Sequence, residues 1–212
     1  MEQIMKFIGI TGGVGAGKTQ ILSFLDKQPG VRVMLADEIA HELMEPQTEC
    51  FKRLQAEFEG EDLYQPDGSF DRQKLAAVLF SDQKKRERLN AIVHPAVREY
   101  VIQQKNLEKQ KGEISLLVLE AALLIEEHYD EICDELWYIY TSRENRRERL
   151  KASRGYSDAR VDEIFASQLT EEAYRSHCSV VIDNNGTIEE TIAQTNAAIQ
   201  TLKKKHIEEK SI

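Results

Sequence analysis

The residues whose types and spacing point most directly to chemistry lie in a glycine-rich segment near the start of the chain. Glycines there let the backbone curl so that several N–H groups converge on phosphate oxygens, and the start of a following helix favours an anion. The segment fits the pattern G-x-x-x-x-G-K-[ST] and consists of Gly12, Gly13, Val14, Gly15, Ala16, Gly17, Lys18 and Thr19. Lys18 would neutralise the β and γ phosphates and Thr19 would bind Mg²⁺. With Thr11 before it, the segment predicts a site for MgATP or MgGTP rather than a turn that only caps a helix.

A carboxylate that follows the second apolar run is the next candidate. A hydroxyl group that accepts a phosphoryl group needs a nearby carboxylate to orient it and to take its proton. Asp37 stands at the end of that run, and the ends of neighbouring parallel strands converge on one crevice. From position alone, Asp37 is equally suited to be the N-cap of a helix that starts with Glu38.

Arginines are concentrated between residues 142 and 168. They are Arg143, Arg146, Arg147, Arg149, Arg154 and Arg160. Guanidinium groups in a mobile lid would stabilise the negative charge of a transferring phosphoryl group, whereas the alternative is a salt-bridged surface helix. GTPases usually carry Asn-Lys-x-Asp after a later strand, but 136–141 runs into Ser-Arg-Glu-Asn. The sequence therefore favours a kinase over a GTPase.

Short apolar runs and helical periodicity indicate the elements that must position these residues. Strands alternate with helical segments, which predicts an α/β fold with three layers around a parallel sheet, as in P-loop NTPases. The predicted strands are 7–11, 31–35, 114–119, 136–140 and 180–182. Residues 49–111 are charged and helical in pattern, with a turn at 65–68 and a break at Pro95, and predict an inserted helical subdomain.

The composition excludes several classes of function. The chain has 212 residues, 41% of them hydrophobic, and a formal net charge of −9, so we expect neither nucleic acid nor an anionic membrane as a partner. Cys50, Cys133 and Cys178 share no close spacing, which suits neither a disulfide framework nor a zinc site. The polar first six residues and the apolar run 114–125, interrupted by Glu120, predict no signal peptide or membrane span. We expect a cytoplasmic protein.

Several spaced motifs, in order, give the chain a resemblance to the dephospho-coenzyme A kinase family. The similarity extends from Ile8 to about Gly186. The matching segments are 9–13 with Lys18-Thr19, Ala36-Asp37-Glu38-Ile39-Ala40, Phe80-Ser81-Asp82, His94-Pro95, Leu123-Leu124 with Glu126, Arg149-Leu150, Gln168 and Asp183-Asn184-Asn185-Gly186. The resemblance implies ATP-dependent phosphorylation of the ribose 3′-hydroxyl of dephospho-coenzyme A. It also implies Asp37 as the base, with Lys18 and Arg149 stabilising the phosphoryl group.

The resemblance assigns roles to the remaining segments. The helical insertion 49–111 would bind the acceptor, with the His94-Pro95 turn and Leu123 among its contacts, and 142–177 would be the lid. The nucleotide-binding core would then consist of 1–48, 112–141 and 178–212. On composition alone, a histidine such as His94 is more often structural and bonds a backbone carbonyl.

Two further features concern the nucleotide and its metal ion. The resemblance implies that the loop with Asn184 and Gly186 lies beside the adenine of ATP, although its residues by themselves indicate only a turn. Glu120 matches a carboxylate of the family and would act on Mg²⁺ through a bound water, in addition to Thr19.

The chain departs from the family pattern at four places. The family often has Asp where this chain has Leu35, Arg where it has His41, and Pro where it has Ala122. Its second lid arginine falls on Ser153, so Arg154 is a possible replacement through a small shift. Another P-loop small-molecule kinase and a nucleotide-binding regulator without transferase activity are therefore the alternatives. We expect a monomer or a small homo-oligomer.

Overall fold

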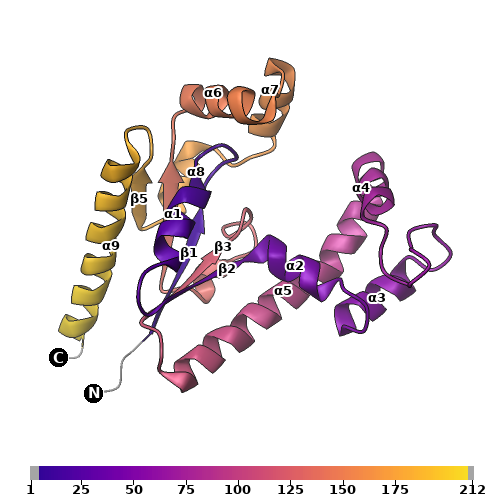
Figure 1. Cartoon of the computed structure of the whole chain (residues 1–212), viewed down its shortest axis with the longest axis horizontal. Helices are drawn as coiled ribbons and strands as arrows, with labels where there is room; N and C mark the ends of the chain where they lie inside the picture. Colours follow the sequence, from indigo (N-terminus) through magenta and orange to yellow (C-terminus); the bar gives the residue numbers. More distant parts are fainter. Residues whose placement is uncertain (1–4, 210–212) are drawn as a thin grey trace. The chain divides into compact units, whose positions relative to one another are not determined.

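The computed structural model describes residues 5–209 and contains a five-stranded sheet (Figure 1). Its strand order is β2-β3-β1-β4-β5, and β1 pairs in parallel with both β3 and β4, as β4 does with β5. The strands are β1 (Lys6–Thr11), β2 (Val31–Leu35), β3 (Leu116–Glu120), β4 (Glu135–Tyr140) and β5 (Val180–Asp183). Each predicted strand is present within two residues of its predicted bounds, and the α/β class is confirmed.

The apolar runs form strands because they are buried between helices. The central strand β1 is flanked by β3 and β4, and its side chains Phe7, Ile8 and Ile10 are fully buried. Such continuous apolar runs are typical of parallel strands covered on both faces. The helices of this part are α1 (Lys18–Asp26), α6 (Arg143–Arg154), α7 (Asp158–Ala166), α8 (Glu171–His177) and α9 (Ile188–Glu209), with a short 3₁₀ helix η1 (Tyr129–Glu131).

The chain divides into two compact units. The first comprises the described residues up to Val33 and those from Lys111 onward, and the second is Met34–Gln110. The second unit contains α2 (Ala36–Leu43), α3 (Glu49–Glu57), α4 (Arg72–Ser81) and most of α5 (Gln83–Lys111). It therefore starts earlier than the insertion 49–111 expected from sequence, because α2 belongs to it.

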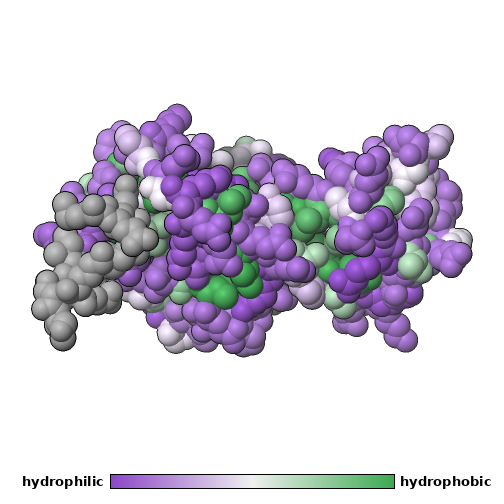
Figure 2. All heavy atoms as spheres, turned by 90° about the horizontal axis from the view of Figure 1, so that it is seen from below, coloured by the Kyte–Doolittle hydropathy of each residue, from purple (hydrophilic) through white to green (hydrophobic). Residues whose placement is uncertain are grey.

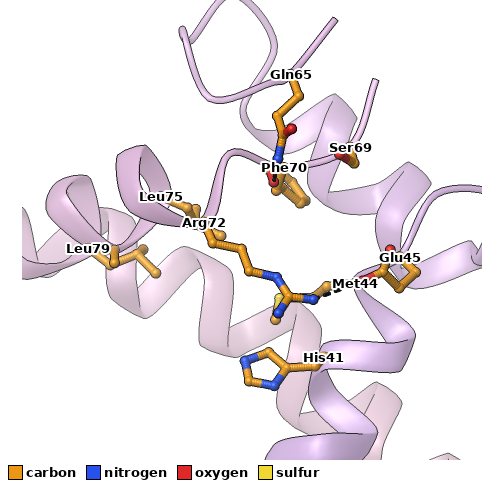
Figure 3. Close-up of a pocket in the computed structure, with 10 residues that line it drawn as sticks. His41, Met44, Glu45, Gln65, Ser69, Phe70, Arg72, Leu75 and Leu79 are labelled. Carbon is orange, nitrogen blue, oxygen red and sulfur yellow. Dashed lines mark hydrogen bonds and ion pairs between the residues drawn. The ribbon is translucent and has the colours of Figure 1, made fainter. Parts of the chain in front are cut away.

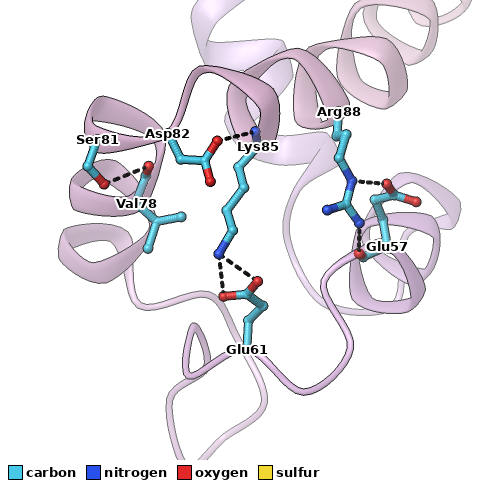
Figure 4. Close-up of polar contacts among 7 residues, drawn as sticks. All are labelled: Glu57, Glu61, Val78, Ser81, Asp82, Lys85 and Arg88. Carbon is cyan, nitrogen blue, oxygen red and sulfur yellow. Dashed lines mark hydrogen bonds and ion pairs between the residues drawn. The ribbon is translucent and has the colours of Figure 1, made fainter.

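An aromatic cluster and a set of ion pairs stabilise the second unit. Tyr64 stacks on Phe70, with ring centroids 5.0 Å apart, and Phe51 packs edge-on against both. The turn predicted at 65–68 is present between Tyr64 and Phe70, which pair as an isolated bridge. Figure 4 shows Lys85 and Arg88, on α5, bonded to Glu61 and Glu57, which come after and at the end of α3.

Helix α5 runs through Pro95, so the prediction of a break there was wrong, and His94 lies inside a helix rather than in a turn. A proline inside a helix removes one backbone hydrogen bond and costs about 3 kcal/mol. The helix continues because its buried face extends on both sides of the proline. The buried apolar residues are Leu89, Ile92, Val93, Val97 and Val101, and together they outweigh this cost at about 1.5–3 kcal/mol for each large side chain.

Helices α6, α7 and α8 occupy the segment 142–177 and carry well-defined caps. The hydroxyl groups of Ser142, Ser157 and Thr170 accept hydrogen bonds from the first turns of the three helices, which satisfies backbone N–H groups that lack a helical partner. Arg147 bonds Asp158 and Asp162 and so links α6 to α7. The segment is therefore a small helical subassembly within the first unit.

Hydrophilic residues dominate the face of the molecule in Figure 2, and hydrophobic residues appear on it in limited areas. This agrees with a charged fraction of 31%. Within residues 5–209, no helix has both the length and the apolar character needed to cross a bilayer.

Candidate active site

The glycine-rich segment forms a loop between β1 and α1, as the motif requires. Lys18 is the first residue of α1, and its Nζ donates a hydrogen bond of 2.7 Å to the carbonyl oxygen of Gly12, at the other end of the loop. Nζ also lies 3.4 Å from Oε1 of Glu120, at the end of the neighbouring strand β3. The lysine therefore spans the mouth of the loop, where phosphate groups would enter.

Three side chains hold the loop in place by donating hydrogen bonds to the carbonyl oxygen of Ala16. This oxygen accepts hydrogen bonds from the side chains of Asn184 at 2.7 Å and Thr141 at 3.0 Å, and a longer one from Arg149 at 3.4 Å. Gly17 follows with φ +84°, and a Cβ there would lie 2.3 Å from Nδ2 of Asn184. Glycine is required at this position both by the left-handed backbone and by the close approach of the asparagine.

Arg149 projects from α6 onto the same part of the loop. Its Nη2 donates a 2.7 Å hydrogen bond to the carbonyl oxygen of Asn184, and its Nη1 lies 3.4 Å from Thr141 Oγ1. Its described partners are thus all neutral oxygens, with no carboxylate among them. The structure brings Arg149 and the loop together, and the assignment of this arginine to a lid stays a prediction.

Asn184 and Gly186 lie immediately after β5. The side chain of Asn184 is 3% exposed, and its oxygen accepts a hydrogen bond from Thr191 Oγ1 while its nitrogen binds Ala16. Gly186 is exposed at the surface. Asn184 therefore supports the loop backbone, and a contact of this segment with adenine stays a prediction.

The donor groups fit a magnesium ion that is held mainly by phosphate. Thr19 is exposed at the start of α1, and Glu120 provides a carboxylate beside Lys18. No cluster of three or more His, Cys, Asp or Glu side chains within the described part of the chain is arranged to hold a metal. Mg²⁺ commonly binds through one or two protein groups plus substrate phosphates and waters, so this sparse set suits it. Thr11 Oγ1, at the end of β1, is buried without a partner in the described residues.

Asp37 belongs to the second unit and lies in the first turn of α2. The helix begins at Ala36 with Leu35 as its N-cap, so the alternative that Asp37 caps a helix starting with Glu38 was wrong. The Asp37 side chain is exposed, and a carboxylate in a first helical turn is stabilised by the helix dipole. It is therefore available to a substrate.

The other residues predicted to contact the acceptor are dispersed along the chain. His94 and Pro95 are in the middle of α5, in the second unit, whereas Leu123 is 41% exposed on a turn after β3, in the first unit. The structure thus places them on different elements, and their roles stay predictions.

A pocket of about 420 Å³ in the second unit was not anticipated from the sequence. Figure 3 shows the Arg72 side chain extending toward Glu45, to which it bonds at 3.1 Å, with His41 close by. The pocket is lined by His41, Met44, Glu45, Gln65, Ser69, Phe70, Arg72, Leu75, Ala76 and Leu79. Its lining combines apolar side chains with the ionic groups of Arg72 and Glu45, which suits a ligand with both characters.

Comparisons with known proteins agree with this geometry. The family model described as dephospho-CoA kinase matches residues 6–190. A dephospho-CoA kinase of Shouchella clausii is 36% identical over 192 residues, which are 91% of this chain and 96% of that protein. A dephospho-CoA kinase of Geobacter sulfurreducens is 37% identical over 186 residues, 88% of this chain and 93% of that protein.

Among solved structures, a protein of Thermus thermophilus superposes with a TM-score of 0.73 at 30% identity, covering 94% of this chain and 98% of that one. The glycine-rich loop and its lysine are parts that a P-loop kinase needs, and the family match covers residues 6–190. The chain belongs to the dephospho-CoA kinase family.

Proposed function

We propose that the chain transfers the γ-phosphoryl group of ATP to the ribose 3′-hydroxyl of dephospho-coenzyme A. The bond from the γ-phosphorus to the β–γ bridging oxygen breaks, and a new bond forms to the 3′-oxygen. The hydroxyl proton passes to a carboxylate, and ADP leaves. The observation that carries the proposal is the convergence of Lys18 and Arg149 on one phosphate loop in a member of this family.

Each catalytic group has a distinct role in this reaction. Asp37 accepts the proton of the hydroxyl group. Its carboxylate is exposed and comes soon after β2, which lies next to β3 in the sheet. Lys18 binds the β and γ phosphates in ground and transition states alike, and Arg149 offsets the charge that spreads over the phosphoryl oxygens. The backbone of residues 11–19 binds the phosphates, and the loop with Asn184 and Gly186 lies beside the adenine of ATP.

Thr19 and Glu120 would hold Mg²⁺, Thr19 directly and Glu120 through water. When bound, the ion would supply positive charge that offsets the charge developing on the leaving ADP. Glu120 also contributes without the ion, because its carboxylate lies 3.4 Å from Lys18 Nζ and so helps to hold this ammonium group at the loop.

The second unit is the acceptor-binding part in this proposal. Its pocket offers the apolar side chains Leu75 and Leu79 to the pantetheine arm and the guanidinium of Arg72 to a phosphate. His41 is in the position where the family often has arginine, so a smaller imidazole ring replaces a guanidinium group at the edge of the pocket. His94, Pro95 and Leu123 provide further acceptor contacts.

Cell location and assembly follow from simpler features. Cys50 and Cys178 are buried free thiols, which supports a reducing compartment, and we assign the protein to the cytoplasm. We propose a monomer or small homo-oligomer that binds no nucleic acid and no membrane, in line with the net charge of −9.

Coupled ADP release with MgATP and a panel of acceptors tests the function. The panel contains dephospho-coenzyme A, adenosine, shikimate, gluconate and pantothenate. We expect turnover with dephospho-coenzyme A and coenzyme A as its product. Turnover restricted to another acceptor would show a different small-molecule kinase, and ATP binding without turnover on any acceptor would show a regulator.

A further inference from the structure

The arginines of the lid differ in what neutralises their charge. Arg147 is paired with Asp158 and Asp162, and Arg160 with Glu163, all at the surface. Arg146 and Arg149 have no carboxylate within salt-bridge distance among the residues that the structure describes. Being three residues apart on α6, they share one helix face. That face is turned toward the phosphate loop, since both side chains bond loop carbonyls.

Arg146 is the arginine that lies directly on the loop. Its Nε donates a 2.9 Å hydrogen bond to the carbonyl oxygen of Val14, and its Nη2 bonds Oε1 of Gln168. Its guanidinium carbon lies 4.5 Å from the centroid of the Phe165 ring. The approach to Gly13 is so close that a Cβ on that residue would be 2.3 Å from the guanidinium carbon. The charge is thus fixed from three sides at a loop built to hold phosphate.

This arrangement leaves a positive charge without an anion. Burial lowers the pKa of Arg146, but a guanidinium group remains protonated in proteins. A partly buried charge that meets only neutral oxygens and an aromatic ring is expensive to maintain. Nη1 has no hydrogen-bond partner among the described residues. The anion that this loop admits is a nucleotide polyphosphate, and it would supply both the missing charge and the missing acceptor.

We infer that Arg146 is a further catalytic residue, which takes the nucleotide polyphosphate as its counter-ion and, with Arg149, stabilises the transferring phosphoryl group. The inference rests on the proposed function and adds a second guanidinium to it. The inference also explains how the chain manages without the family's second lid arginine, whose position is occupied by Ser153. Ser153 donates a hydrogen bond to the backbone oxygen of Arg149 instead. Arg154 does not replace it, because its side chain is exposed and, among the residues that the structure describes, lies over the Tyr156 ring without a carboxylate partner.

A purely structural role for Arg146 predicts different results for its replacement. If Arg146 only fastened α6 to the loop, its loss would weaken the binding of ADP and of a transition-state mimic equally and would lower thermal stability. A group that meets the phosphoryl oxygens acts more strongly in the transition state, so its loss reduces kcat and the affinity for the mimic while ADP affinity is kept.

The experiment compares Arg146→Gln and Arg146→Lys with the matched control Arg147→Ala, one residue along the same helix. Glutamine retains an amide donor for Val14 but no charge, and lysine retains the charge but not the planar fork. The readouts are kcat with dephospho-coenzyme A, the Kd of MgADP with and without aluminium fluoride, and the melting temperature. We expect Arg146→Gln to lose on the order of 10² or more in kcat and the tightening by aluminium fluoride, with lysine intermediate and Arg147→Ala close to wild type.

Two results would overturn the inference. One is a kcat for Arg146→Gln equal to that of Arg147→Ala, and the other is an equal loss of affinity for ADP with and without aluminium fluoride. Failure of Arg146→Gln to fold leaves Arg146→Lys to decide, by the same two comparisons. If wild type did not turn over dephospho-coenzyme A, the proposed function would fail, and the aluminium fluoride comparison would still judge Arg146.

Discussion

The side-chain nitrogen of Asn184 donates a hydrogen bond of 2.7 Å to the carbonyl oxygen of Ala16, in the middle of the phosphate loop. The two residues are 168 positions apart, so the loop after the last strand supports the loop after the first. Thr191 completes the contact by donating to the oxygen of the same side chain at 2.9 Å. A buried amide with both ends engaged fixes the backbone from which Gly17 and Lys18 start.

Replacement of Asn184 by alanine should therefore disturb both folding and nucleotide binding. It removes a donor from Ala16 and leaves the Thr191 hydroxyl without that acceptor, which costs about 1–3 kcal/mol of unfolding free energy. We expect a lower urea midpoint and weaker binding of ADP, measured by calorimetry. Asn196→Ala is the matched control because Asn196 is exposed on α9. Equal stability and equal ADP affinity in the two variants would refute the supporting role.

The carboxylate of Asp37 should matter for chemistry and not for nucleotide binding. Asp37→Asn keeps the shape but cannot accept a proton, and general base catalysis contributes typically about 10²–10⁴ in rate. We expect kcat to fall by that order while the Kd of MgADP is retained, measured by coupled ADP release and calorimetry. Glu38→Gln, an exposed neighbour in the same first turn, serves as the control. Retained turnover in Asp37→Asn would end its assignment as the base.

Local patterns were sufficient for the sheet but not for every helix. Each strand was predictable because a short apolar run between turn residues has few other ways to be buried. The break expected at Pro95 was wrong because tertiary packing of α5 outweighs the local cost of a proline. The start of α2 at Ala36 was also missed, because its N-cap residue Leu35 forms no side-chain cap that a sequence pattern would reveal.

The phosphate loop could be read from the sequence because its chemistry lies in eight consecutive residues. Sequence motifs did not single out Arg146 among the six arginines of 142–168, because its neighbours Phe165 and Gln168 come from another helix and the segment after it, and only the fold brings them together. A usable signal did exist. Arg146, Arg149 and Leu150 share one helical face at spacings of three and four, and Leu150 is buried, so that face had to pack inward.

The pocket of the second unit should control acceptor affinity alone. Ala76 lines it on α4, whereas Ala77, the next residue, does not. Both are exposed, so a tryptophan at either position should be tolerated, but only Ala76→Trp would fill the pocket. We expect Ala76→Trp to raise the KM for dephospho-coenzyme A at least about tenfold, with the KM for ATP and the melting temperature as in Ala77→Trp. Equal acceptor KM values in the two variants would place the acceptor elsewhere.

Two buried groups of the first unit make stability depend on alkaline pH. Burial raises the pKa of Cys178 from an ordinary 9.0 to about 12. Burial, with a smaller contribution from Glu171, also raises the pKa of Tyr138 from 10.0 to about 12. Both groups stay protonated in the folded chain while they ionise in the unfolded one. The unfolded state therefore binds fewer protons above pH 9, and stability must fall as the pH rises.

Cys178→Ala should flatten this fall between pH 9 and 10, where of these two groups only the thiol contributes, and Tyr138→Phe should flatten it only above pH 10. One proton corresponds to a slope of at most about 1.4 kcal/mol per pH unit, and urea unfolding at half-unit intervals from pH 8 to 11 would resolve it. Tyr138→Phe is thus the control for the lower interval. Parallel curves for wild type and Cys178→Ala between pH 9 and 10 would mean that the thiol is not shielded from water in the folded protein.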